Sequence, residues 1–143
     1  MNRAYEKTFS VEGDNFDNAG TASIEIKKIL KDLRIDEDVL RKTAIAVYES
    51  ELNIISYARS GNITLYVDDD TINIDVEDEG PGIEDIDLAM QPGYSTATEH
   101  IRQMGFGAGM GLYNIKSCSD LFEISSTPNV GTHLKIIIKR NGR

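Results

Sequence analysis

Residues 77–112 read EDEGPGIEDIDLAMQPGYSTATEHIRQMGFGAGMGL, and this stretch decides the fold of the chain. A glycine cluster stands at each end of it, DEGPGI (Asp78 to Ile83) and GFGAGMGL (Gly105 to Leu112). Glycine serves where the backbone passes through positive φ or comes close to another group. Two such clusters on either side of a polar segment indicate a ligand that the chain wraps, and phosphate is the usual ligand of loop amides.

A second motif, ESELN, lies upstream at residues 49–53. Its Glu49 and Asn53 are four residues apart, so in a helix both side chains lie on one face. An amide oxygen beside a carboxylate suits Mg²⁺ and a nucleophile that the ion helps to position. Glu51, the other acid of the motif, points away from Glu49 and is expected to be solvated.

Taken singly, each motif also has an ordinary structural interpretation. The glycines of GFGAGMG recur at every second residue, which fits neither a dinucleotide-binding GxGxxG nor a P-loop, and such a run is more often a flexible loop. Its exit into a helix favours an anion site, because amides at a helix N-terminus bind anions. DEGPG fits any turn, but an aspartate at a strand end can accept a hydrogen bond from an exocyclic base amine. Glu49 and Asn53 are otherwise typical of a solvated helix face.

Composition excludes several classes of protein. The chain has 143 residues, of which 40% are hydrophobic, and a net charge of −9, so we expect residues 1–143 to form a single globular domain. The acidic balance disfavours nucleic acid as a partner, because phosphates require a concentrated basic surface. Cys118 is the only cysteine, so no intramolecular disulfide can form. No apolar run reaches the ~20 residues of a membrane span and no signal segment begins the chain, so we expect a cytoplasmic protein without a membrane partner.

Hydrophobic periodicity predicts the element order β-α-α-β-β-(short α)-loop-α-β-β. The corresponding segments are residues 3–11, 17–33, 36–58, 62–67, 71–78, 84–90, 94–104, 109–120, 121–126 and 132–139. Helices that stand in blocks between antiparallel pairs predict an α+β fold. We expect a two-layer α/β sandwich in which helices cover one face of a mixed, mostly antiparallel sheet. A doubly wound fold would need strands and helices in strict alternation.

The two long helices are predicted in more detail. Five apolar residues of the first lie at helical spacing: Ala22, Ile26, Ile29, Leu30 and Leu33. Asp36 is expected to cap the second helix. The apolar stripe of that helix is predicted to be Ile45, Tyr48, Leu52 and Ile55. RSGN (Arg59 to Asn62) is expected to end it with a C-terminal glycine.

In the order ESELN, DEGPG, GFGAGMG, the three motifs are far more specific than any one of them. Together they resemble the N, G1 and G2 boxes of the GHKL ATPase superfamily, which includes gyrase and the histidine kinases, and GTHLKI (Gly131 to Ile136) resembles its last box. The resemblance spans about residues 49–138 and implies the Bergerat ATP-binding fold. Small size and motif spacing are most similar to the anti-sigma factor serine/threonine kinases. GYSTA (Gly93 to Ala97) is similar to their switch-kinase branch.

The resemblance implies a role for each matching residue. Glu49 corresponds to the catalytic carboxylate that accepts the proton of the attacking hydroxyl, and Asn53 corresponds to the ligand of Mg²⁺. Asp78 corresponds to the adenine-binding aspartate, and Thr132 to a residue that contacts adenine directly or through water. The glycines correspond to those beside the adenine and those of the lid over the phosphates: Gly80, Gly82, Gly105, Gly107, Gly109 and Gly111.

The implied function is that of a protein-serine/threonine kinase that uses ATP and Mg²⁺. Its implied substrate is a STAS-domain anti-anti-sigma-like protein in a stress or sporulation type of partner-switching pathway, with a sigma factor or another regulator as a further partner. Phosphoryl transfer needs positioning and charge neutralisation more than a covalent group, and these residue types supply both. Whether the chain is a monomer or a homodimer is left open.

Two rival functions stand beside the kinase. The alternative is a non-catalytic, nucleotide-gated anti-sigma or partner-binding module, which would need no general base at Glu49. The catalytic half of a two-component histidine kinase is disfavoured, because we see no dimerisation helix with a phosphoacceptor histidine. The sequence identifies neither the substrate protein nor the hydroxyl that is modified, and it does not separate an inhibitory from an activating kinase.

Overall fold

The computed structural model describes residues 5–91 and 111–140, and within them the predicted order of elements is confirmed. The elements are β1 (Tyr5–Glu12), the 3-10 turn η1 (Phe16–Asn18), α1 (Thr21–Asp32), α2 (Glu37–Tyr57), β2 (Ser60–Val67), β3 (Thr71–Glu79), α3 (Ile86–Ala89), α5 (Gly111–Cys118), β4 (Leu121–Thr127) and β5 (Gly131–Lys139). The predicted α+β class is also confirmed.

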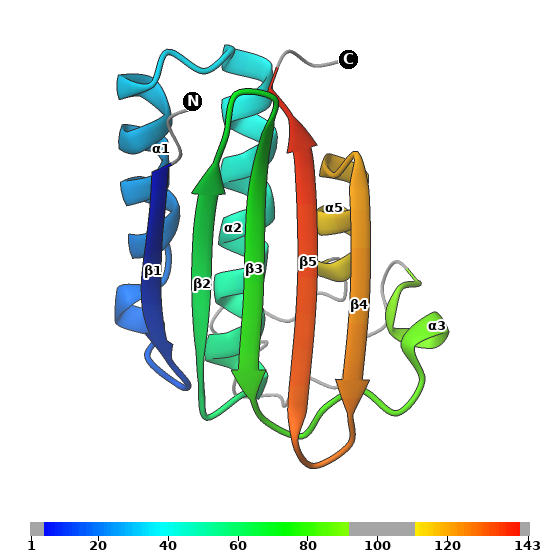
Figure 1. Cartoon of the computed structure of the whole chain (residues 1–143). Coiled ribbons are helices and arrows are strands. Elements are labelled where there is room, and N and C mark those ends of the chain that lie inside the picture. Colours follow the sequence, from blue (N-terminus) through cyan, green and yellow to red (C-terminus); the bar gives the residue numbers. More distant parts are fainter. Residues whose placement is uncertain (1–4, 92–110, 141–143) are drawn as a thin grey trace.

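The strands form one five-stranded sheet in the order β1-β2-β3-β5-β4. Every neighbouring pair is antiparallel, so the sheet is antiparallel throughout and the expectation of a mixed sheet is wrong in that detail. Helices α1, α2 and α5 lie on one face of it, as predicted, and α3 lies beyond the β4 edge (Figure 1). Strands β3 and β5 are adjacent in the sheet although residues 80–130 separate them in sequence.

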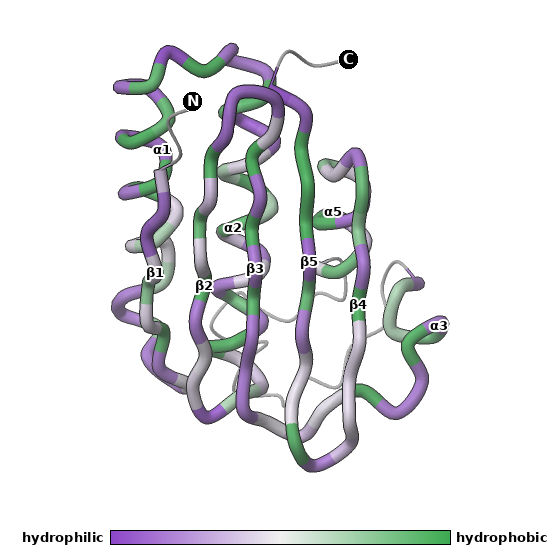
Figure 2. Tube along the Cα trace, viewed as in Figure 1, coloured by the Kyte–Doolittle hydropathy of each residue, from purple (hydrophilic) through white to green (hydrophobic). Residues whose placement is uncertain are grey.

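The core lies between the sheet and its helices. Apolar and polar residues alternate along β2, β3 and β5 (Figure 2), and the buried ones face the helices. The fully or nearly fully buried strand residues are Ile63, Leu65, Val67, Ile72, Ile74, Val76, Leu134, Ile136 and Ile138. The alternate residues form the open face of the sheet, which no described helix covers. The sheet therefore packs against its helices through the apolar face that this alternation of residues creates.

Helix α2 is the central helix, and its predicted apolar stripe is wrong at two of its four residues, whereas Leu52 is half-buried and Ile55 is buried as predicted. Asp36 caps it as predicted, with the Asp38 N–H donating to its carboxylate over 3.2 Å. Ile45 and Tyr48, however, are 40% and 38% exposed. The buried residues of α2 are Val39, Leu40, Thr43, Ala44, Ala46, Val47, Ser50, Glu51, Ile54 and Ile55. Because α2 packs against the sheet, α1 and α5, its buried face is wide and admits small and polar residues.

The glycine of RSGN does not end α2, contrary to the prediction. The helix ends at Tyr57, Ala58 is extended, and Gly61 lies within β2. A Cβ on Gly61 would come within 2.7 Å of the Glu77 carbonyl oxygen and 2.8 Å of Ile54 Cδ1. Close packing of the strand under α2 therefore requires this glycine, since no side chain fits there.

Glu51 is buried, at 2% exposure, so the expectation of a solvated side chain is wrong. Its carboxylate accepts the backbone N–H groups of Ala22 (3.1 Å) and Ser23 (3.4 Å) in the first turn of α1. The N-cap residue of α1 is Gly20, which has no side chain to accept them. Glu51 thus caps α1 from the neighbouring helix, where the helix dipole also favours a negative charge.

We expect Glu51→Ala to lower the free energy of unfolding by about 1–3 kcal/mol, because it leaves two buried N–H donors without an acceptor. Chemical denaturation measures this. The matched control is Glu25→Ala on α1, where the partly exposed pair with Lys7 (3.6 Å) is worth at most about 1 kcal/mol. Equal losses in the two variants would contradict the capping role.

The loss at Glu51 should also depend on pH. Burial raises the pKa of the Glu51 carboxyl above its ordinary 4.5, and the hydrogen bonds from α1 only partly oppose this. Folded Glu51 therefore holds its proton to higher pH than unfolded Glu51. The stability that it contributes is present in full below the unfolded pKa and declines as pH rises through the raised pKa. The difference between wild type and Glu51→Ala should narrow as pH rises above the ordinary pKa of 4.5, and a widening would contradict the assignment.

Candidate functional site

Asp78 and Thr132 meet at the paired ends of β3 and β5. Thr132 donates its backbone N–H to Asp78 Oδ1 over 3.0 Å, and its hydroxyl lies 2.9 Å from Ser126 Oγ on β4. Burial raises the pKa of the Asp78 carboxyl, and the hydrogen bond from Thr132 opposes the shift. Asp78 Oδ2 has no hydrogen-bond partner among the described residues. A half-buried carboxylate oxygen is therefore left to accept a donor from a ligand.

Glycines pack the chain tightly around Asp78. A Cβ on Gly131 would lie 2.0 Å from the Asp78 carbonyl oxygen, and a Cβ on Gly82, whose φ is +72°, would lie 2.4 Å from the Thr127 carbonyl oxygen. Gly80 packs on the end of α2, where its Cβ would come within 3.0 Å of Ala58 Cα. The DEGPG turn is thus packed between α2 and the β4–β5 hairpin, with no room for a side chain at Gly82 or Gly131 and little room at Gly80.

Glu49 and Asn53 both face α5, as their spacing predicts. Asn114 of α5 donates its side-chain N–H to Glu49 Oε2 over 3.1 Å. One turn further along α2, Asn53 Oδ1 lies where a Cβ on Gly111 would come within 3.0 Å of it. The two helices therefore run past each other with the start of α5 against Asn53. The absence of a side chain at Gly111 leaves space beside the Asn53 amide.

The pair Asp78 and Thr132 and the pair Glu49 and Asn53 lie at the same end of the molecule. Asn53 is one helical turn before Tyr57, and Gly80 packs on the Tyr57–Ala58 end of that helix. A ligand that reaches from the Asp78 carboxylate to the Asn53 amide would therefore lie along the last turns of α2. Gly105, Gly107 and Gly109, the other predicted lid residues, lie outside the described residues.

Three residues of this region were not singled out from the sequence. Ser126 accepts the Ile83 N–H (2.8 Å) and donates to the Gly131 carbonyl (3.0 Å), so it ties the DEGPG turn to the last hairpin. Gly131 makes room for Asp78, and Asn114 contacts Glu49. Only Gly131 carried a signal, as the first residue of GTHLKI. A lone serine in a strand or asparagine in a helix carries none.

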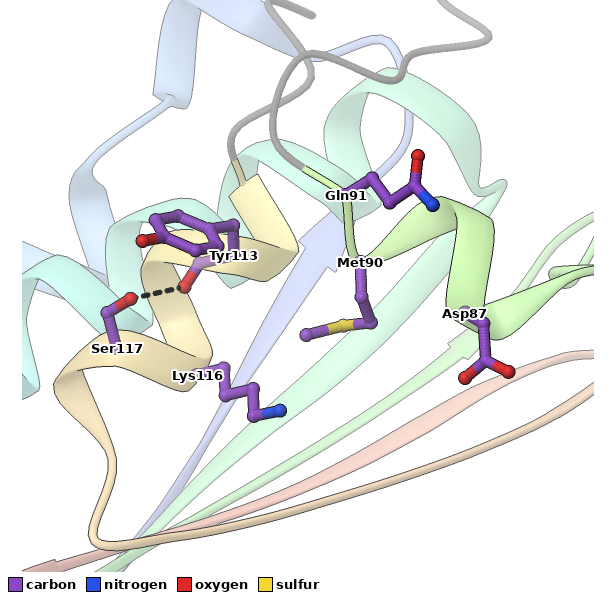
Figure 3. A pocket seen from close by; sticks show the side chains of 6 residues that line it. All are labelled: Asp87, Met90, Gln91, Tyr113, Lys116 and Ser117. Atoms are coloured by element: carbon purple, nitrogen blue, oxygen red, sulfur yellow. Dashed lines mark hydrogen bonds between the residues drawn. The ribbon is translucent and has the colours of Figure 1, made fainter.

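A separate hollow of about 480 Å³ opens between α3 and α5 (Figure 3). Its lining residues are Asp87, Met90, Gln91, Tyr113, Lys116 and Ser117. Ser117 donates its hydroxyl to the Tyr113 carbonyl of the same helix over 2.9 Å. None of Glu49, Asn53 and Asp78 lines this hollow, so it is not the predicted nucleotide site.

The donor set fits ATP and Mg²⁺. At Asp78, a carboxylate oxygen that has no hydrogen-bond partner among the described residues suits an exocyclic amine, and the nearby hydroxyl of Thr132 supplies a second polar group. The side-chain oxygen of Asn53 is the type of ligand that Mg²⁺ takes from proteins, and bare backbone at Gly111 leaves space for it. Among the described helices, none is both long enough and apolar enough to cross a membrane.

Comparisons with known proteins find a matching family model and several relatives. A family model described as histidine kinase-, DNA gyrase B-, and HSP90-like ATPase matches residues 39–142, a range that contains every predicted site residue. An anti-sigma F factor of Caldanaerobacter subterraneus subsp. tengcongensis is 38% identical over 64% of this chain and 57% of its own length. An anti-sigma F factor of Oceanobacillus iheyensis is 31% identical over 81% of this chain and 80% of its own length. The serine/threonine-protein kinase RsbT of Bacillus subtilis is 30% identical over 78% and 80%. The chain thus spans little more than half of the first relative.

Proposed function

The chain belongs to the histidine kinase-, DNA gyrase B- and HSP90-like ATPase family, and we propose that it is an ATP-dependent protein-serine/threonine kinase that acts on a regulatory protein. Membership implies ATP binding. The names of the relatives, anti-sigma F factor and serine/threonine-protein kinase, support the kinase. The observation that carries the proposal is the gathering of Glu49, Asn53 and Asp78 at one end of α2. In this proposal residues 1–143 work as one kinase domain in the cytoplasm.

Each residue of the site has one task in the proposed reaction. Asp78 accepts the adenine amine through the carboxylate oxygen that does not bind the Thr132 N–H, and Thr132 contacts the same base. Asn53 holds Mg²⁺, which when bound supplies positive charge against the phosphates. Glu49 accepts the proton of the attacking serine or threonine hydroxyl. Gly80 and Gly82 admit the base, whereas Gly105, Gly107, Gly109 and Gly111 belong to the lid over the phosphates.

The proposed substrate is a STAS-domain anti-anti-sigma-like protein. Support comes from the relatives named anti-sigma F factor, a name that implies a regulatory protein as partner. A sigma factor or another regulator is the second proposed partner. The test is incubation with Mg·ATP and candidate STAS-domain proteins, followed by intact-mass measurement of each candidate. One added phosphate on a candidate supports the kinase, whereas ATP binding without transfer to any candidate favours the nucleotide-gated binding module.

Asn114 is proposed to position the Glu49 carboxylate. We expect Asn114→Leu to lower the rate of phosphate transfer about 3- to 10-fold, because it removes one hydrogen bond of about 1 kcal/mol to the proposed base. The KM for ATP should not change, since Asn114 contacts Glu49 and not Asn53 or Asp78. Steady-state kinetics at several ATP concentrations separates the two parameters.

The control for Asn114 is Ser117→Ala, which alters an exposed residue one turn further along α5. Its transfer rate should match that of wild type. A rise in KM for ATP together with a fall in the rate would indicate a general distortion of the α2–α5 pair. That result would contradict a positioning role.

A further inference from the structure

Three metal-ligating side chains meet on the open face of the sheet, opposite the helices. Asp75 and Glu77 are alternate residues of β3, and His133 stands directly across from Glu77 on β5. One ligand atom from each lies within 4.8 Å of the other two, and His133 Nε2 is 2.9 Å from Asp75 Oδ1. Asp75 and His133 are about half exposed, at 50% and 44% of their side-chain surfaces. The cluster is open to ions from solvent.

The backbone holds these three side chains in place. Strands β3 and β5 are interior strands of the sheet, because β2 and β4 flank them. Directly paired residues have Cβ atoms about 4.5–5.5 Å apart, and alternate residues of one strand point to the same side. Glu77, Asp75 and His133 therefore converge without any rearrangement of the backbone. Glu77 is exposed, so its longer side chain can turn toward the other two.

We propose that Asp75, Glu77 and His133 bind a divalent transition-metal cation of the Zn²⁺ class. One imidazole nitrogen with two carboxylate oxygens is a ligand set that Zn²⁺ takes, with water at the fourth position. Two carboxylates and a neutral imidazole also bring a charge that matches the cation. A plain ion pair between Asp75 and His133 would need no Glu77, and the three-way convergence distinguishes a metal site from that pair.

Lys135 is expected to weaken cation binding at this site. It stands directly across from Asp75 on β5, on the same face as His133, and also faces Glu123 of β4. No ion pair joins Lys135 to Asp75 among the described residues, and the strand register puts Lys135 on the same open face as the three proposed ligands. Repulsion between Lys135 and the metal therefore weakens binding. Removing this charge should tighten it.

The site is distinct from the proposed nucleotide site, although the two are back to back. Glu77 immediately precedes Asp78, and His133 immediately follows Thr132. The side chains of Asp78 and Thr132 lie on the helix-covered side of the sheet, opposite the proposed metal site. A cation on the open face would fasten the same pair of strand ends that carries the proposed adenine contacts. Mg²⁺ is not the ion expected there, because it prefers six oxygen ligands over imidazole.

The experiment is a titration of the full chain with ZnCl₂ by calorimetry, without nucleotide and in a buffer that does not chelate zinc. We expect one Zn²⁺ per chain. His133→Asn and Glu77→Gln should each weaken binding by at least about tenfold, since even outer-shell partners of a metal are worth that much. Lys135→Gln should bind more tightly than wild type. Thermal unfolding without metal shows whether each variant is folded.

His100→Asn is the matched control, because it removes the only other histidine of the chain. Its Zn²⁺ affinity should equal that of wild type. Failure of the wild type to bind Zn²⁺, or equal affinity of wild type and a folded His133→Asn, would overturn the proposal. A loss of Zn²⁺ affinity in His100→Asn but not in His133→Asn would also overturn it. None of these outcomes depends on the kinase proposal, because no nucleotide is present.

Discussion

Asp78→Asn is expected to weaken ATP binding about 10- to 150-fold without unfolding the protein, which is the loss of one hydrogen bond to a charged group. The asparagine side chain keeps one oxygen, so it can still accept the Thr132 N–H that Asp78 accepts at 3.0 Å. Its other atom becomes an NH₂ donor. A donor would then face the exocyclic amine of adenine, itself a donor, so the proposed hydrogen bond is lost.

Stability separates this effect from damage to the fold. Burial raises the pKa of the Asp78 carboxyl, so the folded state holds the proton more tightly than the unfolded state does. The ionised form therefore costs stability at pH values above the raised pKa. Asp78→Asn removes that cost, so near neutral pH its free energy of unfolding should equal or exceed that of wild type. Calorimetry with ATP and denaturation without it measure the two effects.

The control is Asp69→Asn, an equal change of charge in the exposed turn between β2 and β3. Its ATP affinity should equal that of wild type. Asp78→Asn with unchanged ATP affinity would contradict the adenine site. A loss of affinity that came with a much lower free energy of unfolding would point to a structural role for the carboxylate instead.

Local rules predicted the elements well where each element carries its own signal. The β2–β3 hairpin follows from two alternating runs, and its turn forms because the Asp68 carboxylate accepts the N–H groups of Asp70 (2.9 Å) and Thr71 (2.7 Å). Asp36 caps α2 for the same local reason. Such signals need no knowledge of the rest of the chain, because the interacting groups are two or three residues apart.

The errors come from residues whose partners are distant in the sequence. Glu51 was expected in solvent because nothing near it in the chain demands burial, but its partners are the N–H groups of α1, 29 and 28 residues away. Gly61 resembled a helix end, whereas the approach of Ile54 and of the Glu77 carbonyl decides its place in a strand. The wide buried face of α2 depends on its three neighbours, the sheet, α1 and α5. The hydrophobic periodicity of one helix cannot predict which other elements pack against it.

The candidate site divides in the same way. Motif order predicted Glu49, Asn53 and Asp78 as site residues, and the structure brings these three to one end of α2. Asn114 had no motif, and only the packing of α5 against α2 places its amide 3.1 Å from Glu49. A residue that supports a reactive group through space is invisible to spacing rules, because its sequence position is free to vary.

Glu49→Ala is expected to lower phosphate transfer about 10²- to 10⁴-fold, the usual contribution of a general base, while ATP affinity stays within a few-fold of wild type. Asn53 and Asp78 remain in place in this variant, so the nucleotide keeps its proposed contacts. Glu49 is half-buried and its only described hydrogen-bond partner is Asn114, so its removal leaves one amide that water can reach. The fold should therefore survive. Transfer to a STAS-domain substrate is followed by intact mass, and ATP binding by calorimetry.

Glu49→Ala also distinguishes the proposed kinase from the nucleotide-gated binding module. A kinase loses transfer and keeps binding, because the base acts only on the attacking hydroxyl. A nucleotide-gated binding module shows no Glu49-dependent chemistry, and the variant should exchange partners as wild type does. Glu37→Ala, in the exposed first turn of the same helix, controls for the loss of one negative charge from α2. If Glu49→Ala transferred phosphate at the wild-type rate, the base would be elsewhere, and the proximity of Glu49 to Asn114 would be a packing contact alone.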